Sequence, residues 1–420
     1  MIRVREFDVE TDLKAVEEME SRCEVGPTDA GAGSNKKKKM MKKKKKKKKK
    51  RSMSLYVDLL GDPLCRVRHA PDHVMLVAEY GEKKEMVGVI RACIKMVTRG
   101  RAASSFLPAY VKIAYILGLR VSPFHRRLGI ATKLVERVEL WCAGRGAEYA
   151  YMATDPANSA SLNLFTRRLS YSRFRSPVLL AHPVHSHLLP LSPSAAVLRL
   201  PPSAATALYS RLLPPSAVEF LPSDLPALLS HPLTLSTFLA IPSSSSSSAS
   251  SVISTNAFSL SDLPSSFAIM SLWDSTRVLR LRVAGAPTAA RAALALLRAV
   301  DARAPWMRVP SIRDIFRPFG VYIMYGLHMA GPEGPRLMRS LCRLAHNAAV
   351  ADENCAAVVA ELGRGDPVRA AVPHWKRFSC EEDVWCMKRL SAGGDDAIHG
   401  DDWLASPATT DVIFVDPREF

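Results

Sequence analysis

The stretch SPFHRRLGIATKLV, residues 122–135, joins a strand-like segment to a helix-like one, and this junction constrains the fold strongly. Residues 111–121 have the apolar character of a buried strand, whereas apolar side chains recur at helical spacing from Ile130 to Cys142. Alternating strands and helices predict an α/β (α+β) fold with a central mixed β-sheet. The same patterns place further strands at 2–5, 74–80, 86–98 and 147–153, and helices at 11–23, 55–60 and 159–168.

The start of the helix after this junction is suited to binding an anion. A helix N-terminus has backbone N–H groups without intrahelical partners and a partial positive charge. Gly129 and Ala131 leave the approach open, and Arg126 and Arg127 add guanidinium donors that fit phosphate oxygens. The geometry suits a pyrophosphate, although a solvated Arg-Arg surface is the competing interpretation. The pattern differs from the GxxxxGK[ST] loop of nucleoside triphosphatases.

Charge is concentrated in one low-complexity segment. The 420-residue chain has a formal net charge of +18, of which fourteen positive charges lie within 36–51, so the remainder is close to +4. Beyond the lysine run, the composition therefore does not imply a nucleic-acid partner. The serine-rich stretch 243–251 is expected to be a flexible loop without chemistry of its own.

Cysteine and histidine spacing does not indicate a metal site. Eight cysteines include no CxxC pair, and we expect no metal because His69, His125, His374 and His399 lack ligand spacing. The charged N-terminus lacks a signal-peptide pattern, and no apolar run is long enough to span a membrane. These features predict a soluble nuclear or cytoplasmic protein without a membrane partner.

Two motifs resemble those of the GNAT N-acetyltransferases. The acetyl-CoA motif of that family has Arg or Gln, two residues, Gly, one residue, then Gly or Ala, which matches Arg126, Gly129 and Ala131 in AYILGLRVSPFHRRLGIA. The second segment, NSASLNLF, supplies Asn158 and Phe165. Two motifs in the expected order are more specific than either alone. The resemblance implies a GNAT fold and acetyl-CoA as cofactor.

A closer resemblance extends over nearly the whole chain. The segments MIRVREFDVETDLKAVEEME, DLLGDPLCRVRHAP, PHWKRFSCEEDVWCMKRL and VDPREF are similar to plant HOOKLESS-type N-acetyltransferases. That family is associated with hormone-controlled differential growth and with the nucleus. The resemblance implies acetyl transfer to an amine of a protein or small molecule in plant growth regulation. The acceptor and the oligomeric state are not specified by the residues.

The family resemblance also implies which residues bind acetyl-CoA. The pantetheine arm is expected to pair with backbone groups of Leu119 and Val121, and Asn158 and Phe165 are expected to face the cofactor. The pyrophosphate is expected at Arg126 and Arg127 and at the amides of Leu128, Gly129, Ile130 and Ala131.

The catalytic residues are less clear because familiar positions have changed. Leu117-Gly118 stands where many GNAT enzymes carry a carboxylate, and Phe165 replaces a tyrosine that can protonate the thiolate. Tyr115 and Glu79 are the remaining candidates for proton transfer. A half-buried strand aromatic and a surface charge are the competing interpretations of these two residues.

The second half is expected to be a degenerate copy of the first. We place a GNAT domain at 1–185, with a disordered Lys-rich insertion at 27–53, and a GNAT-like domain at 186–420. The second copy would turn at GPEG, residues 331–334, where Pro332 and Glu333 disfavour phosphate binding. An unrelated α/β domain is the competing interpretation.

Two classes of function remain open at this level. An acetyl-CoA-dependent N-acetyltransferase is favoured by the cofactor turn. A GNAT-derived regulatory or binding module, acting through a protein partner, is favoured by the loss of familiar proton-transfer residues. We favour the enzyme, because positioning and electrostatic stabilisation can support much of acyl transfer without a dedicated base.

The lysine run provides a first test. Like charges at this density repel one another and do not pack into a core, so 36–51 is expected to be disordered. The resemblance implies a shorter connection here, so we interpret 36–51 as an insertion, with a nuclear-localisation or nucleic-acid segment as the competing interpretation. Deleting 36–51 should leave the melting temperature and acetyl-CoA affinity unchanged. A large drop in melting temperature, measured by calorimetry, would refute this interpretation.

Overall fold

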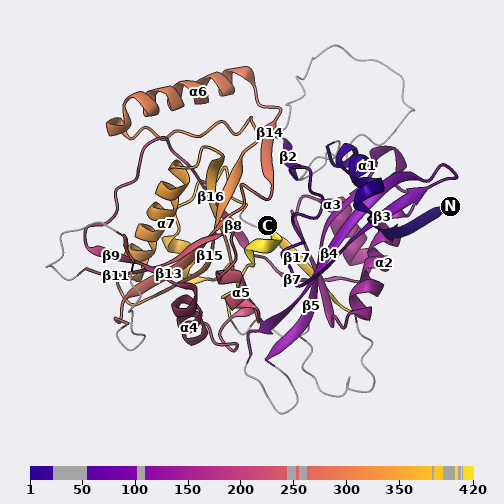
Figure 1. Cartoon of the computed structure of the whole chain (residues 1–420), viewed down its shortest axis with the longest axis horizontal. Coiled ribbons are helices and arrows are strands. Elements are labelled where there is room, and N and C mark those ends of the chain that lie inside the picture. The colour runs from indigo at the N-terminus through magenta and orange to yellow at the C-terminus, as the bar shows by residue number, and fades with distance from the viewer. Residues whose placement is uncertain are drawn as a thin grey trace, which may run out of the picture.

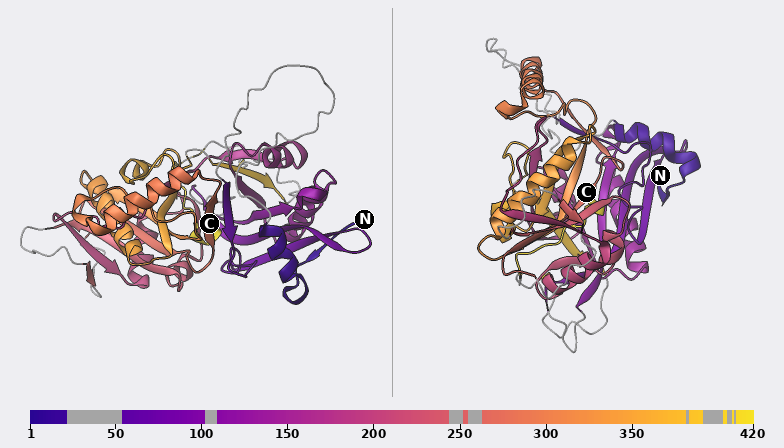
Figure 2. Two further views of the ribbon diagram at one scale, coloured as in Figure 1. Left: turned by 90° about the horizontal axis from the view of Figure 1, so that it is seen from above. Right: turned by 60° about the vertical axis from the view of Figure 1, so that its left-hand side comes forward.

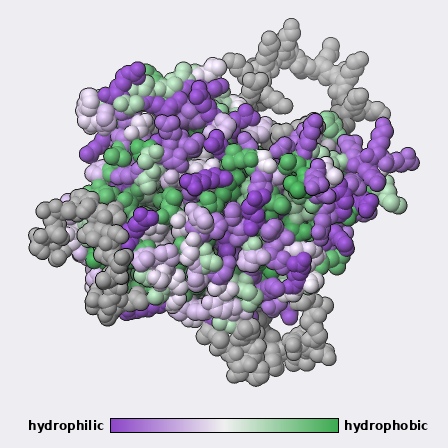
Figure 3. Space-filling view, viewed as in Figure 1, coloured by the Kyte–Doolittle hydropathy of each residue, from purple (hydrophilic) through white to green (hydrophobic). Residues whose placement is uncertain are grey.

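The computed structural model describes residues 1–21, 54–101, 109–243, 252–254, 263–380, 383–390, 403–404, 408 and 410–420. The expected lysine-rich insertion 27–53 lies outside the described residues, as does the serine-rich loop 243–251 apart from Ser243. The described residues form two halves, each built on a large sheet, that lie side by side in Figures 1 and 2. Hydrophilic side chains cover much of the face in Figure 3, with small hydrophobic groups between them.

The first sheet has the strand order β1-β3-β4-β5-β6-β17-β7, and β10 pairs with β4 beside it. The expected strands and helices around the 122–135 junction are confirmed. The strands are β1 (Ile2–Glu6), β3 (Asp72–Tyr80), β4 (Glu85–Arg99), β5 (Tyr110–Val121), β6 (Tyr149–Thr154), β7 (Ser172–Arg175), β10 (Glu219–Pro222) and β17 (Val384–Arg389). The helices are α1 (Val9–Ser21), α2 (Ile130–Gly144), α3 (Ser159–Leu162) and the π-helix Asn163–Arg168.

Helix α2 packs on one face of this sheet because its apolar side chains form a single stripe. Ile130, Leu134 and Val138 are at most 1% exposed and contact alternate residues of the strands, such as Ile90 and Ile116. Burying side chains of this size stabilises the fold by roughly 1.5–3 kcal/mol each. This packing places the start of α2 at the end of β5.

The second sheet has the order β12-β9-β11-β13-β15-β16-β8, in which β9 to β16 follow the pattern of β1 to β6 and β12 adds an edge strand beside β9. The strand β15 leads through a turn at Gly331 into α7, and β16 then pairs with β15 in parallel, as β6 does with β5. This is the architecture that the tandem hypothesis requires. The strands are β8 (Val178–Pro183), β9 (Ala195–Leu200), β11 (Thr234–Pro242), β12 (Val252–Ser254), β13 (Phe267–Asp274), β15 (Gly320–Ala330) and β16 (Cys355–Leu362). The helices are α4 (Pro202–Leu212), α5 (Leu225–Leu229), α6 (Thr288–Arg303) and α7 (Gly334–Val350).

The two halves exchange strands: β10 and β17 of the second half join the first sheet, and β8 joins the second. Strand β17 comes from the end of the chain, yet it lies between β6 and β7 of the first sheet. Strand β8 follows β7 in sequence, yet it pairs with β16 of the second sheet. The expected division between residues 185 and 186 therefore falls after a strand that belongs to the second sheet, and 186–420 includes two strands of the first, β10 and β17.

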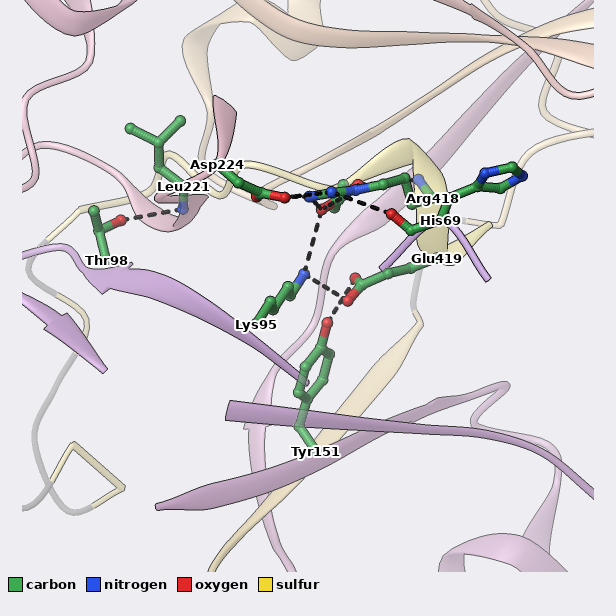
Figure 4. Close-up of polar contacts among 9 residues, drawn as sticks. His69, Lys95, Thr98, Tyr151, Leu221, Asp224, Arg418 and Glu419 are labelled. Atoms are coloured by element: carbon green, nitrogen blue, oxygen red, sulfur yellow. Dashed lines mark hydrogen bonds and ion pairs between the residues drawn. The ribbon is translucent and has the colours of Figure 1, made fainter. Parts of the chain in front are cut away.

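A buried polar network joins the halves near the end of the chain (Figure 4). Glu419 forms an ion pair with Lys95 of β4 at 2.5 Å and accepts a hydrogen bond from the Tyr151 hydroxyl of β6 at 2.6 Å. Arg418 donates to both carboxylate oxygens of Asp224, at 2.6 and 2.9 Å. Removing one partner of such a buried pair typically costs about 3–5 kcal/mol, so these contacts strongly favour one arrangement of the halves.

One expected helix is wrong. Residues 54–58 form strand β2 (Ser54–Asp58), which pairs antiparallel with β14 (Arg280–Ala284) in a separate two-stranded sheet. The partner strand lies more than 200 residues away in sequence, so local periodicity does not reveal this pairing.

The strand exchange predicts that the first half is not autonomous. A fragment ending at residue 185 lacks β17, so β6 and β7 lose their shared neighbour and the apolar face around Met152 loses its cover. We expect this fragment to be insoluble or unfolded, and co-expression with 186–420 to restore solubility. Soluble yield and far-ultraviolet circular dichroism test this, and a fragment that unfolds cooperatively by itself would contradict it.

Candidate functional site

The turn before α2 is open and positively charged. Gly129 caps the helix in the left-handed region with φ of 83°, and a Cβ atom there would meet nothing within 4 Å. Arg126 and Arg127 are exposed, and Arg127 also has a positive φ of 68°. A non-glycine residue in this region costs of order 1–3 kcal/mol and is frequent at ligand sites. Two exposed guanidinium groups thus lie beside the first amides of α2, which have no intrahelical partners.

Strand β5 is bent away from β6 just before this turn. The two strands pair from Ile113 to Tyr115, and no further pairing is found between them among the described residues. Gly118 has φ of 64° opposite a register shift on β4, which is the geometry of a β-bulge. A Cβ atom at Gly118 would lie 2.7 Å from Nη1 of Arg91, so a larger residue would displace this guanidinium as well as strain the backbone. The bulge opens a gap along the outer edge of β5.

Backbone groups of Leu119 and Val121 face this gap. The Ser122 amide donates to the Val87 carbonyl of β4 at 2.8 Å, so it points toward β4. Because successive residues of a strand point their backbone groups to opposite sides, Val121 and Leu119 face away from β4. An extended ligand arm can add to such an edge as an extra strand. The expected roles of these residues fit the geometry.

Asn158 and Phe165 lie next to β6 but have structural roles. The Asn158 side chain caps α3 by accepting a hydrogen bond from the Ser161 amide at 3.2 Å. Phe165 is 1% exposed and packs edge-on against Tyr171, with 5.0 Å between ring centroids. The Phe165 ring therefore belongs to the core beneath the site, within a π-helix, an element common at functional sites.

The two candidate proton-transfer residues are not brought together. Tyr115 lies opposite Cys93, which lies opposite His73 on β3, whereas Glu79 is six residues further along that strand, about 20 Å away. Glu79 is paired with Arg5 at 2.7 Å. Any catalytic role must therefore belong to one of them alone.

Tyr115 is a buried phenol among acidic groups. It is 8% exposed and stacks on Tyr151, with 4.8 Å between the ring centroids. Burial raises the pKa of Tyr115 well above its usual value, and the negative charges of Glu419 and Glu361 raise it further. The side chain is therefore protonated at neutral pH and can act as a donor but not as a base.

Glu361 is a carboxyl group that the sequence analysis did not identify. It lies on β16 of the second sheet, lines a small cavity with Tyr325 and Asp366, and none of the described residues donates to its buried Oε1 atom. Burial, with the charges of Asp383 and Glu419, raises its pKa to about 8. A carboxyl group with such a pKa is a candidate for proton transfer. No motif surrounds it, so only the fold reveals it.

The corresponding turn of the second half is closed. A Cβ atom at Gly331 would collide with the Ser265 carbonyl, and the Ser266 hydroxyl accepts the Glu333 amide at 3.4 Å. The Glu333 carboxylate also contacts the Arg336 guanidinium. The cation and an amide of this turn are thus already satisfied within the chain, in contrast to the open turn at Gly129.

Comparison with known proteins agrees with this geometry. Residues 44–171 match the model of the acetyltransferase (GNAT) family. The rice (Oryza sativa subsp. japonica) protein named acetyl transferase GW6a is 55% identical, over 100% of this chain and 98% of the rice protein. The chain belongs to the GNAT acetyltransferase family. This GNAT chain is also 44% identical to the probable N-acetyltransferase HLS1 of Arabidopsis thaliana, over the full length of both.

Two solved structures that are similar to this chain were determined with a bound acyl-CoA. Saccharomyces cerevisiae N-myristoyltransferase with bound myristoyl-CoA is 10% identical, with a TM-score of 0.49 over 92% of this chain and 79% of that one. Arabidopsis thaliana NAA60 in complex with acetyl-CoA is 18% identical, with a TM-score of 0.29 over 42% and 87%. Among the described helices, none has the length and apolar composition needed to cross a membrane.

The shifted pKa of Glu361 predicts a pH-dependent stability. Between about pH 4.5 and pH 8, the folded chain keeps a proton that the unfolded chain loses, so the free energy of unfolding falls as pH rises. Glutamine keeps the neutral form, so Glu361→Gln should raise the melting temperature by roughly 4 °C at pH 9 and by much less at pH 5.

Exposed Glu353→Gln is the control for this experiment and should change neither value. Differential scanning calorimetry at both pH values provides the measurement. An equal effect of Glu361→Gln at pH 5 and pH 9 would contradict a raised pKa.

Proposed function

We propose that this chain transfers the acetyl group of acetyl-CoA to an amine of a protein or small molecule. The observation that carries the proposal is the open turn at Gly129, with Arg126 and Arg127 beside it and the unpaired edge of β5 leading into it. Acetyl-CoA, when bound, supplies the activated acetyl thioester. The HOOKLESS-type resemblance supports a role of this activity in plant growth regulation.

Different groups of the chain would bind different parts of acetyl-CoA. The amides of 128–131 and the two arginines would hold the pyrophosphate, because both the helix N-terminus and guanidinium groups favour phosphate oxygens. The backbone at Leu119 and Val121 would pair with the pantetheine arm. The closed turn at Gly331 supports one cofactor site per chain rather than two.

Two groups that lie where the halves meet, Tyr115 and Glu361, would transfer the protons. Tyr115 is protonated and could donate to the leaving thiolate, whereas Glu361, with a pKa of about 8, could accept the proton of the amine. Catalysis through Glu361 would increase as pH rises through about 8, because only its ionised form accepts a proton. The assignment of Glu79 to this step is less favourable, because Arg5 already pairs with it.

The alternative function is a regulatory or binding module that works through a protein partner. The ion pair of Glu79 and the burial of Tyr115 favour it, because neither side chain presents a solvent-exposed catalytic group. The two functions differ in turnover. The module would bind acetyl-CoA, or no ligand, without transferring the acetyl group to any of a panel of peptides and polyamines.

Gly129→Glu tests the cofactor site. The glutamate places a side chain and a negative charge at the start of α2, where the phosphates would bind, so acetyl-CoA affinity should fall at least tenfold, or about 1.4 kcal/mol. Isothermal titration calorimetry gives the affinity, and wild type should bind one acetyl-CoA per chain.

Gly144→Glu is a matched control on the same helix. Gly144 lies at the other end of α2, and a Cβ atom there also meets nothing within 4 Å. This variant should bind acetyl-CoA as the wild type does. Unchanged affinity in a folded Gly129→Glu protein would refute the site, and two acetyl-CoA molecules per chain would refute the closed second turn.

A further inference from the structure

Three histidines from two distant segments meet beside the second sheet. His182 lies on β8, His185 follows that strand, and His346 lies on α7. One ring nitrogen of each lies within 4.8 Å of those of the other two. His185 and His346 are 6% and 2% exposed, so the group is largely closed to water. Imidazole is a common ligand of Zn²⁺, and three histidines with a water molecule form a known coordination set.

Hydrogen bonds orient two of these rings as metal ligands. The Nδ1 atom of His182 lies 2.9 Å from the Pro183 carbonyl, and that of His185 lies 2.7 Å from the Ser311 carbonyl. Because a carbonyl oxygen accepts but does not donate, Nδ1 carries the proton in both rings. The lone pair is therefore on Nε2. Metal-binding histidines commonly donate their second ring nitrogen to a backbone carbonyl in this way.

The third ring presents its lone pair to the same group. The Nε2 atom of His346 accepts a hydrogen bond from the His185 amide at 3.0 Å, which shows that its lone pair points at the 182–187 segment. Its Nδ1 atom lies 3.3 Å from Oδ1 of Asn347. A metal ion would take the place of the amide hydrogen on this nitrogen.

The surroundings suit a cation. His187 stacks on His185, with 5.1 Å between ring centroids, and its Nδ1 atom lies 2.7 Å from the carboxylate of Asp301. Asp301 is fully buried and supplies a negative charge close to the cluster. A dication would thus meet imidazole ligands and a nearby counter-charge.

We propose that His182, His185 and His346 bind one Zn²⁺ ion that fastens the exchanged strand β8 to helix α7. Strand β8 ends at Pro183, and the chain then leaves the second sheet along α7, where Asn347 bonds both backbone groups of Leu189. The ion would hold the chain that follows β8 in place against α7. Its role is structural, and it is separate from the acetyl-CoA turn of the first half.

The experiment is a Zn²⁺ titration of the full-length chain, purified without a polyhistidine tag and freed of metal with a chelator. Calorimetry should give one site per chain with a dissociation constant in the micromolar range or below, and Zn²⁺ should raise the melting temperature by several degrees. Co²⁺ should give the intense visible absorption of a tetrahedral site in the wild-type chain.

Variants distinguish this site from the cysteines and from surface histidines. His182→Gln, His185→Gln and His346→Gln should each weaken Zn²⁺ binding at least tenfold, whereas His73→Gln on β3 should not change it. If the histidine variants do not fold, the Co²⁺ spectrum of the wild type decides, because thiolate ligands add a charge-transfer band that imidazole ligands do not. No stoichiometric binding, binding unaffected in folded histidine variants, or a thiolate spectrum would overturn the proposal.

Discussion

The rest of the structure depends on the backbone pairing of each exchanged strand with the sheet of the opposite half. Strand β17 pairs with β6 on one side and β7 on the other, and β8 pairs with β16. Each half therefore completes the sheet of the other half through its main chain. Because unpaired strand edges expose unsatisfied N–H and C=O groups, neither sheet is complete without the opposite part of the chain.

The exchange places the second half where it can contribute to the chemistry of the first. Glu361 lies on β16, yet its charge raises the pKa of Tyr115 on β5. Glu419 is close to both groups and bonds Tyr151. A chain without the usual carboxylate on the strand before the turn can thus obtain one from its second half. Under the proposed function, the second sheet would therefore contribute to proton transfer as well as to packing.

The contrast between the two turns arises from small differences in side chains. Both follow a strand with a left-handed glycine, Gly118 in the first half and Gly326 in the second. The first turn remains open because nothing packs near Gly129, whereas Ser265 and Ser266 press against Gly331. We therefore expect only the first turn to bind an anion. In the second turn the Glu333 amide and the Arg336 guanidinium already contact other groups of the chain.

Local patterns predicted much of the first half. The helical stripe from Ile130 to Cys142 and the apolar strand before it identified the sheet, the helix and the turn, because those features depend on residues close in sequence. The same reasoning failed at 55–60, where β2 depends on β14 for its pairing. The histidines at 182–187 were also missed, because their third partner is His346 on α7.

The sequence by itself determined the α/β class, the strand-turn-helix junction at 126–131 and membership of an acetyltransferase family, because short-range spacing encodes each of them. Tertiary structure alone decided which strands are exchanged, that Glu79 is paired with Arg5, and that Glu361 lies near Tyr115. It also decided the burial that shifts the pKa of Glu361. The proximity of the three histidines likewise depends on the tertiary fold. Burial and charge proximity depend on segments separated by hundreds of residues, and no local pattern records them.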